Sequence, residues 1–239
     1  KTPVGCSIIQ SAAAKGHEVW MACHKNFLVE QASEKLKAFG VYHSVLQSGT
    51  KYNARHKVHV CSLGVLRNRI DGMRKPRVLL WDECHHLGAR TWTELMAALP
   101  DTIHIGLTAT PIRPSGGGLG DHFDSLITGP SVADLIAWGK QHPGEGLCDY
   151  RMFSVQNSIS ADGLHSRGGD FIPEELGELM DRPAIIGDAV AEFRKHAINR
   201  KFLTFAPTLA FSEHIAQKYR EEGINCVHLD GSTDKKTIK

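Results

Sequence analysis

The sequence predicts an α/β protein with a parallel sheet, and three observations support that class. Helical stretches alternate along the chain with short apolar runs of strand length, an order that is typical of parallel sheets. The chain has 239 residues, of which 41% are hydrophobic, enough for a real core in one or two domains. No run approaches the roughly 18 apolar residues of a membrane helix, so we expect no membrane partner.

The first half of the chain predicts a regular alternation of helices and strands. The expected helices cover residues 3–15, 26–40, 63–70 and Trp92 to Leu99, and the expected strands cover 19–23, 41–46, 58–62, 78–82 and 103–107. Asn26 is a suitable N-cap for the second helix, and Gly40 is a suitable terminator. We place this first domain at residues 1–130.

The second half predicts a connecting segment, 131–182, and the start of another α/β unit, 183–239. The expected elements are a loop at 112–122, a helix at 132–139, a strand at 149–155, a linker at 157–170, a helix from Pro183, a strand at 202–206, a helix through Phe211, Ile215 and Tyr219, and a strand at 225–229. Because so short a run cannot close a sheet of five or six strands, we expect the second domain to be truncated.

Two of the expected strands end in polar residues that suit an NTPase. One apolar run delivers the adjacent carboxylates Asp82 and Glu83, and the next delivers a small hydroxyl cluster that begins at Thr108. Such an arrangement suits an enzyme that holds Mg²⁺ with an aspartate and orients a water with a glutamate. The neighbouring Cys84 and histidines do not predict a metal site, because adjacent strand residues point to opposite faces.

These blocks resemble motifs II and III of superfamily 2 helicases and translocases. The first block is Asp82-Glu83-Cys84-His85, and Thr108-Ala109-Thr110-Pro111 follows at a separation similar to that of the family. Other segments resemble further family motifs: residues 22–31 motif Ia, 60–66 motif Ib, 202–214 motif IV, and 228–233 the next block. Residues 118–131 and 181–188 resemble bacterial and phage DNA repair helicases of the DEAD/DEAH-box type, related to the Ssl2/XPB branch.

The resemblance implies a RecA-like domain of the P-loop NTPase type, followed by the truncated start of a second RecA-like domain. Lys1 and Thr2, followed by an apolar helix, resemble the last two residues of a phosphate-binding loop. Lys1 is then expected to neutralise the β- and γ-phosphates of ATP, and Thr2 to ligate Mg²⁺ together with Asp82.

The resemblance also implies catalytic and coupling roles. Glu83 is expected to orient the attacking water. His85 is expected to pass the nucleotide state to Thr108 and Thr110, which link hydrolysis to domain movement. Trp81 is expected in the core, because it alternates with Asp82 on the strand.

Residues in the other family motifs are expected to face nucleic acid. They are His24 and Lys25 of motif Ia, Ser62 of motif Ib, and Gly231 and Ser232 of the later block. Lys25 stands where arginine is more usual, which keeps the charge but loses the guanidinium fork.

Charge distribution predicts a contact with the nucleic-acid backbone independently of the resemblance. Residues 51–77 hold eight lysines and arginines, among them Arg67 and Arg69, against one acid, whereas the net charge of the whole chain is +2. This segment predicts a phosphate-binding face that does not read base sequence.

These features predict an ATP-dependent superfamily 2 DNA helicase or translocase, with ATP and Mg²⁺ as cofactors, DNA as partner and a role in DNA repair. Three alternatives stay open: a restriction-type translocase subunit, an RNA helicase and a non-enzymatic nucleic-acid-binding module. Six cysteines without a Cys-x-x-Cys pair argue against zinc and for a reducing cytoplasm. Because most of the phosphate loop and the arginine finger of motifs V–VI are expected outside these residues, we expect this chain alone to be inactive.

Overall fold

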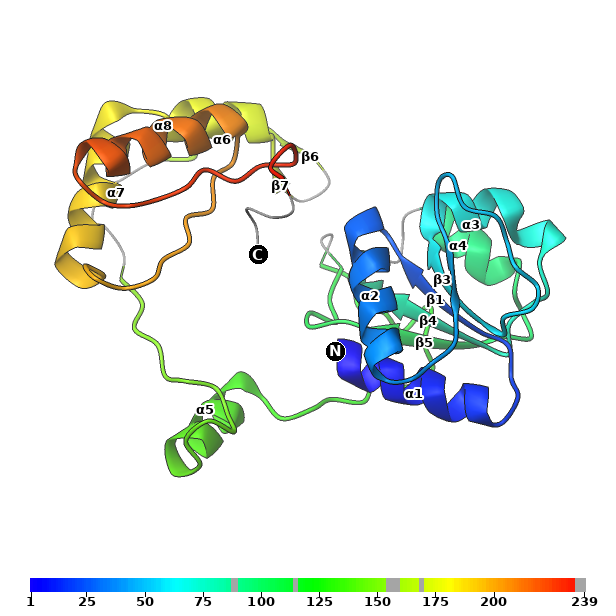
Figure 1. Cartoon of the computed structure of the whole chain (residues 1–239). Coiled ribbons are helices and arrows are strands. Elements are labelled where there is room, and N and C mark those ends of the chain that lie inside the picture. Colours follow the sequence, from blue (N-terminus) through cyan, green and yellow to red (C-terminus); the bar gives the residue numbers. More distant parts are fainter. Residues whose placement is uncertain (87–89, 114–115, 154–159, 168–169, 235–239) are drawn as a thin grey trace. The chain divides into compact units, whose positions relative to one another are not determined.

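The computed structural model of the chain forms two compact units, Lys1–Gly129 and Pro130–Lys239 (Figure 1). The residues it describes are 1–239 apart from 87–89, 114–115, 154–159, 168–169 and 235–239. In the described parts of the chain, no helix is long and apolar enough to cross a membrane.

The first unit is a five-stranded parallel sheet with helices on both faces. Its elements are α1 (Thr2–Ala14), β1 (Val19–Cys23), α2 (Asn26–Ala38), β2 (Ser44–Leu46), β3 (Val58–Ser62), α3 (Leu63–Arg69), a 3-10 helix (Ile70–Gly72), β4 (Val78–Asp82), a second 3-10 helix (Cys84–His86), α4 (Arg90–Ala97) and β5 (Ile103–Leu107). The strand order is β2-β3-β1-β4-β5, and all neighbouring strands are parallel. The predicted α/β class is confirmed, and the sheet is consistent with a RecA-like P-loop NTPase domain.

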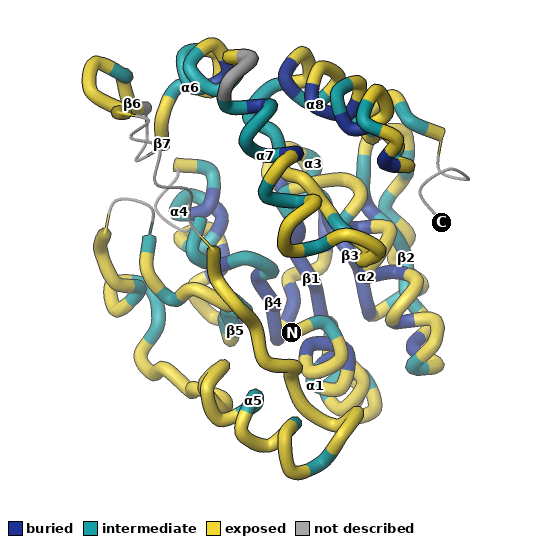
Figure 2. The backbone as a smooth tube through the Cα atoms, turned by 90° about the vertical axis from the view of Figure 1, so that its left-hand side faces the viewer, coloured by how far each residue is buried: buried dark blue, intermediate teal, exposed yellow. Residues whose placement is uncertain are grey.

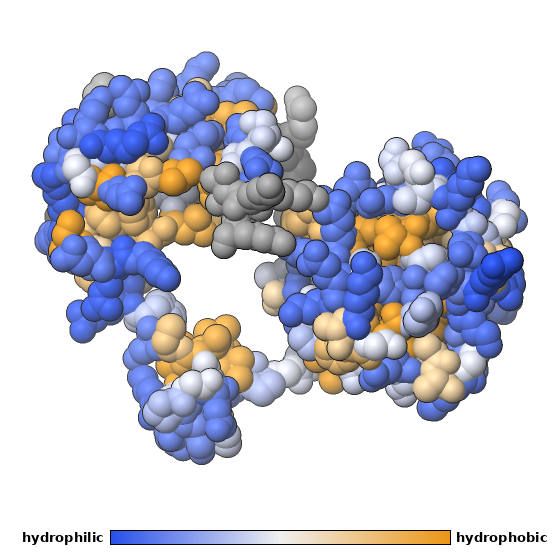
Figure 3. Space-filling model, in the orientation of Figure 1, coloured by the Kyte–Doolittle hydropathy of each residue, from blue (hydrophilic) through white to orange (hydrophobic). Residues whose placement is uncertain are grey.

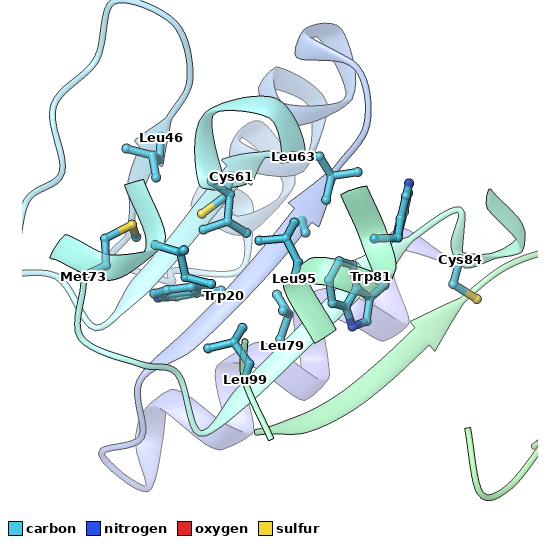
Figure 4. Close-up of a cluster of buried hydrophobic side chains, with 14 residues drawn as sticks. Trp20, Leu46, Cys61, Leu63, Met73, Leu79, Trp81, Cys84, Leu95 and Leu99 are labelled. Atoms are coloured by element: carbon cyan, nitrogen blue, oxygen red, sulfur yellow. The ribbon is translucent and has the colours of Figure 1, made fainter. Parts of the chain in front are cut away.

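Strand residues fill two cores, one on each face of the sheet. Val19 and Met21 of β1 pack with the buried side chains of α1 and α2, whereas Trp20 packs with those of α3 and α4. This division follows from the strand period, which sends successive side chains to opposite faces. Figure 2 shows the central strands as buried, and Figure 4 shows the cluster on the α3 and α4 face, where Trp81 is fully buried as predicted.

Four of the five predicted strands have the predicted bounds, and the deviations lie at element ends. Strand β2 is limited to residues 44–46, because only these residues pair with β3. The predicted Asn26 cap is wrong: Asn26 is already helical, and Lys25 holds the N-cap position with extended backbone and without a side-chain capping bond. Gly40 ends α2 as predicted, with a φ of 69° that favours glycine.

The second unit consists mainly of helices. Its elements are α5 (Val132–Gln141), β6 (Ser166–Arg167), β7 (Asp170–Phe171), α6 (Pro173–Met180), α7 (Pro183–His196) and α8 (Leu209–Glu221). Helix α5 begins with a capping box, in which Ser131 and Asp134 each accept a hydrogen bond from the other's backbone N–H. Apolar residues gather over α5 in Figure 3, and helices α7 and α8 share a separate apolar cluster around Val190 and Phe211.

Three predicted strands of the second unit are not formed. Residues 149–153, 202–206 and 225–229 have no regular secondary structure, and the rest of the first predicted strand lies outside the described residues. Phe202 and Cys226 pack against the α7 and α8 cluster, so these apolar runs contribute to a core without pairing. An apolar run satisfies the local pattern of a strand, but a strand also needs a hydrogen-bonded neighbour, which sequence pattern does not supply.

Candidate active site

The predicted site residues gather because parallel strands end at one edge of the sheet. Cys23 pairs in register with Ser62, and Asp82 with Leu107, so the carboxyl ends of β1, β3, β4 and β5 lie together. In open α/β sheets, ligands bind at this edge. The residues that follow these strands therefore share one surface of the first unit.

Helix α1 brings Lys1 to the same edge. A Cβ atom added to Gly5, in the first turns of α1, would lie 2.9 Å from a methyl carbon of Leu107. This close approach of helix and sheet lets Lys1 Nζ donate a hydrogen bond to Glu83 Oε1, although the two residues are 82 positions apart. Thr2 begins α1, and its hydroxyl makes no hydrogen bond to another described residue.

The two adjacent carboxylates have different environments. Burial raises the pKa of Asp82, against the opposing effect of the Lys1 charge. Burial also acts to raise the pKa of Glu83. The hydrogen bond from Lys1 and the charges of Lys1 and His85 outweigh this effect of burial, so the pKa of Glu83 is lowered. Glu83 also has a φ of 54°, which is uncommon outside glycine and turns the chain sharply after β4.

A chain of close polar contacts links Glu83 to the end of β5. His85 Nδ1 lies 3.3 Å from Glu83 Oε2 and 2.9 Å from Thr108 Oγ1. The Thr108 hydroxyl donates to the Thr110 carbonyl at 3.0 Å and accepts from the Thr110 backbone N–H at 3.0 Å. Because the single hydroxyl proton of Thr108 is thus used, the proton of the His85 bond belongs to Nδ1. The structure therefore connects the three residues for which the sequence predicts coupling.

Sequence reasoning missed a histidine pair beside the carboxylates. The rings of His24 and His86 are 4.9 Å apart, and those of His85 and His86 are 4.2 Å apart. Burial lowers the pKa of both His24 and His86, and a second histidine lowers it further: His86 acts on His24, and His85 acts on His86. Contrary to the strand assumed for residues 84–86, they form a 3-10 helix, and the His86 ring lies against that of His24, the residue after β1. No pattern in the sequence reveals this contact.

The predicted nucleic-acid residues are spread over several places. Lys25 and Ser62 lie at the carboxyl edge, next to the ends of β1 and β3. Arg67 and Arg69 instead lie in the last turn of α3, and both have partners within the unit. Arg67 forms an ion pair with Glu94 at 2.8 Å, and Arg69 donates to the Thr50 carbonyl at 2.5 Å.

Gly231 and Ser232 belong to the second unit and lie in a compact turn. Ser232 donates from its backbone N–H and from its hydroxyl to Asp230 Oδ1, at 2.9 and 2.8 Å. Together with Thr233, these bonds lower the pKa of Asp230 to about 2. The turn is therefore held by an ionised aspartate over the whole physiological pH range.

The residues at the carboxyl edge suit a magnesium–nucleotide complex better than a metal held by protein alone. Asp82 is a half-buried carboxylate with a raised pKa, and no cluster of three metal-ligating side chains occurs among the described residues. Mg²⁺ is commonly bound through one or two carboxylates and completed by substrate phosphates and waters. A lysine beside the carboxylates supplies the positive charge that such phosphates require.

Comparison with known proteins agrees with this geometry. Residues 1–113 match the family "Type III restriction enzyme, res subunit". This is a superfamily 2 helicase-type family, so the match supports a helicase-type NTPase domain in the first unit and the use of nucleotide and metal in general.

The chain is also similar to a "51.5 kDa protein" of Lactococcus phage (isolate 7-9), at 30% identity over 235 residues. The alignment covers 98% of this chain and 48% of the phage protein, so the chain spans about half the length of this relative. Neither comparison shows a specific relationship to the Ssl2/XPB branch.

Proposed function

We propose that the complete protein is an ATP-dependent DNA helicase or translocase of superfamily 2. The observation that carries this proposal is the continuous chain of contacts from Lys1 through Glu83 and His85 to Thr108, beside Asp82. It joins a phosphate-binding cation, a base and a hydroxyl relay at one edge of the sheet. The family match over residues 1–113 supports the same class.

In the proposed mechanism, Lys1 has two alternative anionic partners. In the structure it donates to Glu83 and holds that carboxylate in place. A bound nucleotide supplies a phosphoryl group and a Mg²⁺ ion, and Lys1 and Asp82 would hold these two. With Lys1 on the phosphates, Glu83 Oε1 would be free to accept a proton from water. While Lys1 donates to it, Glu83 is held in its ionised form, because that hydrogen bond and the Lys1 charge outweigh burial and lower its pKa.

The relay gives a physical route from hydrolysis to movement. His85 Nδ1 lies within reach of both Glu83 and Thr108, so a change in the partners of Glu83 changes the bond that His85 makes to the end of β5. Thr110, which is tied to Thr108, precedes the segment that leads out of the first unit. We propose that this connection carries the nucleotide state toward the second unit.

One observation favours a second candidate, a translocating subunit of restriction type. The family that matches residues 1–113 is described by its restriction enzyme res subunit. Such a motor would hydrolyse ATP on duplex DNA without separating its strands. Parallel measurements of ATP hydrolysis and of strand separation on the same duplex would distinguish it from a helicase, and RNA in place of DNA would test the RNA helicase alternative.

The Glu83→Gln variant of the complete protein tests the assignment of the base. We expect ATP hydrolysis to fall by roughly 10²–10⁴-fold, as for loss of a general base, while ATP binding stays near that of the wild type because Asp82 remains. The matched control is Glu94→Gln, since Glu94 pairs with arginines on the surface of the same unit and should leave turnover unchanged. Wild-type turnover by Glu83→Gln would overturn the assignment.

A further inference from the structure

A groove unrelated to the nucleotide site lies at the opposite edge of the sheet. It has a volume of about 640 Å³ and is open to solvent. It is formed where α1 ends, where the chain leaves α2, and where the chain enters β3 at Val58. Its lining residues are Gln10, Ala13, Ala14, Gly40, Val41, Tyr42, Arg55, His56, Lys57 and Val58. Since Val58 begins β3 and Ser62 ends it, the whole length of the strand separates this groove from the carboxyl edge.

An exposed aromatic ring stands at this groove because of how α2 ends. Gly40 adopts a φ of 69°, its backbone N–H donates to the Lys37 carbonyl, and the N–H of Val41 donates to the Leu36 carbonyl. These two bonds form a Schellman motif, which reverses the chain direction and buries Val41. The next residue, Tyr42, is thereby directed outward and is 88% exposed.

Tyr42 stacks on His56 from the facing loop. The two ring planes are 13° apart, with centroids separated by 6.1 Å. Burial of apolar surface does not account for this arrangement, because most of the tyrosine remains in contact with solvent. An exposed, oriented aromatic face beside apolar groove walls is the platform on which a nucleic-acid base stacks.

The groove carries positive charge from Arg55 and Lys57, and only the Lys57 side chain has a hydrogen-bond partner within the described part of the protein. Lys57 Nζ donates to the Gly16 carbonyl at 2.9 Å. The Arg55 guanidinium has no hydrogen-bond or ion-pair partner among the described residues, and none of the ten lining residues is acidic. Arg55 thus differs from Arg67 and Arg69, whose charges are engaged by other groups of the unit. The lining of this one groove thus offers both an arginine side chain with no described partner, which suits a phosphate, and an exposed aromatic ring, which suits a base.

We propose that this groove binds single-stranded nucleic acid, with one base stacked on Tyr42 and the adjacent phosphate held by Arg55. The contact is independent of sequence, because every base offers a face for stacking. It does not rest on the proposed ATPase site, which lies at the other edge of the sheet. An acidic peptide would use the charge of Arg55 but not the flat face of Tyr42, so stacking is the property that decides between them.

The test measures binding of the purified chain to a short oligo(dT) strand by fluorescence anisotropy, without ATP or Mg²⁺. Tyr42→Leu should weaken binding about tenfold, as for loss of one base–aromatic stack, whereas Tyr42→Phe should bind like the wild type. An abasic strand of the same length should bind equally to the wild type and to Tyr42→Leu. An equal effect of Tyr42→Leu on both strands, or none on either, would overturn the stacking contact.

The phosphate contact is tested by the salt dependence of the same binding. Arg55→Gln should reduce the slope of log affinity against log salt by about 0.7, the value for one phosphate contact on a single strand. Lys37→Gln is the matched control, since it removes one exposed charge from the last turn of α2, outside the groove lining. An equal change of slope in both variants would show diffuse charge attraction and overturn the site. Because no step requires ATP hydrolysis, failure here and failure of the proposed ATPase are distinguishable.

Discussion

Acidification should destabilise the first unit through His59, which is fully buried in β3. Its Nδ1 lies 2.6 Å from Ser44 Oγ, and its ring lies 4.9 Å from the ring of Tyr52. Burial lowers the pKa of His59 from 6.5 to about 4. The folded unit therefore holds this imidazole in its neutral form.

The expected magnitude follows from that pKa difference. As the pH falls, the unfolded chain protonates His59 first, so the contribution to stability is full above pH 6.5 and is lost progressively toward pH 4. At about 1.4 kcal/mol for each pH unit, the loss is about 2 kcal/mol by pH 5 and about 3 kcal/mol in total. Glu18, with a carboxylate oxygen 3.4 Å from Nε2, favours the charged ring and makes these values upper limits.

Urea unfolding followed by tryptophan fluorescence measures this effect, because Trp20, Trp81 and Trp92 are buried in the first unit. The comparison is between wild type and His59→Asn, which keeps a polar group toward Ser44 but does not titrate. The variant should be less stable at pH 7, and the gap should narrow as the pH falls to 5. A constant gap between the two proteins would refute the reasoning, because it would mean that His59 does not change its protonation between the folded and unfolded states.

Two further predictions concern the end of β5. Gly106→Ala should lower the free energy of unfolding by about 1–3 kcal/mol, because the added Cβ would lie 2.6 Å from the Phe123 ring. Adding Phe123→Leu to this variant should restore part of the loss. If urea unfolding showed unchanged stability for Gly106→Ala, that result would contradict the close packing. Thr108→Val removes the hydrogen bond to His85, so in the complete protein it should abolish stimulation of ATP hydrolysis by DNA while basal hydrolysis persists. Thr93→Val, which removes a helical hydroxyl elsewhere, is the control, and retained stimulation in Thr108→Val would argue against a relay.

The strands of the first unit were predictable because each of them corresponds to a short apolar run in the sequence. Residues 78–82 and 103–107 are apolar runs bounded by polar residues, and each run becomes a strand with the predicted bounds. The second unit shows the limit of the same pattern, since residues 202–206 and 225–229 are equally apolar but pair with no neighbour. Strand pairing depends on contacts between distant segments, which a local pattern does not contain.

The candidate site was predictable where a motif carries it and not where three-dimensional contacts decide it. The bond of His85 to Thr108 joins two residues that the motif resemblance had already coupled. Charge counting also chose Arg67 and Arg69 for a nucleic-acid face; this stays a prediction, and the structure adds that both side chains have partners inside the unit. Composition gives the number of charges in a segment, whereas only the fold shows which of them remain free.

The indole of Trp81 lies one residue before Asp82 and is bonded across the sheet. Its Nε1–H donates to His104 Nδ1 at 3.0 Å, which ties β4 to β5 directly behind the candidate site. Burial lowers the pKa of His104, so the imidazole stays an acceptor at neutral pH. Any sliding of one strand against the other must lengthen this bond and change the emission of a tryptophan that is shielded from water. The protein thus carries an intrinsic optical probe of strain between the two strands that end in Asp82 and Thr108.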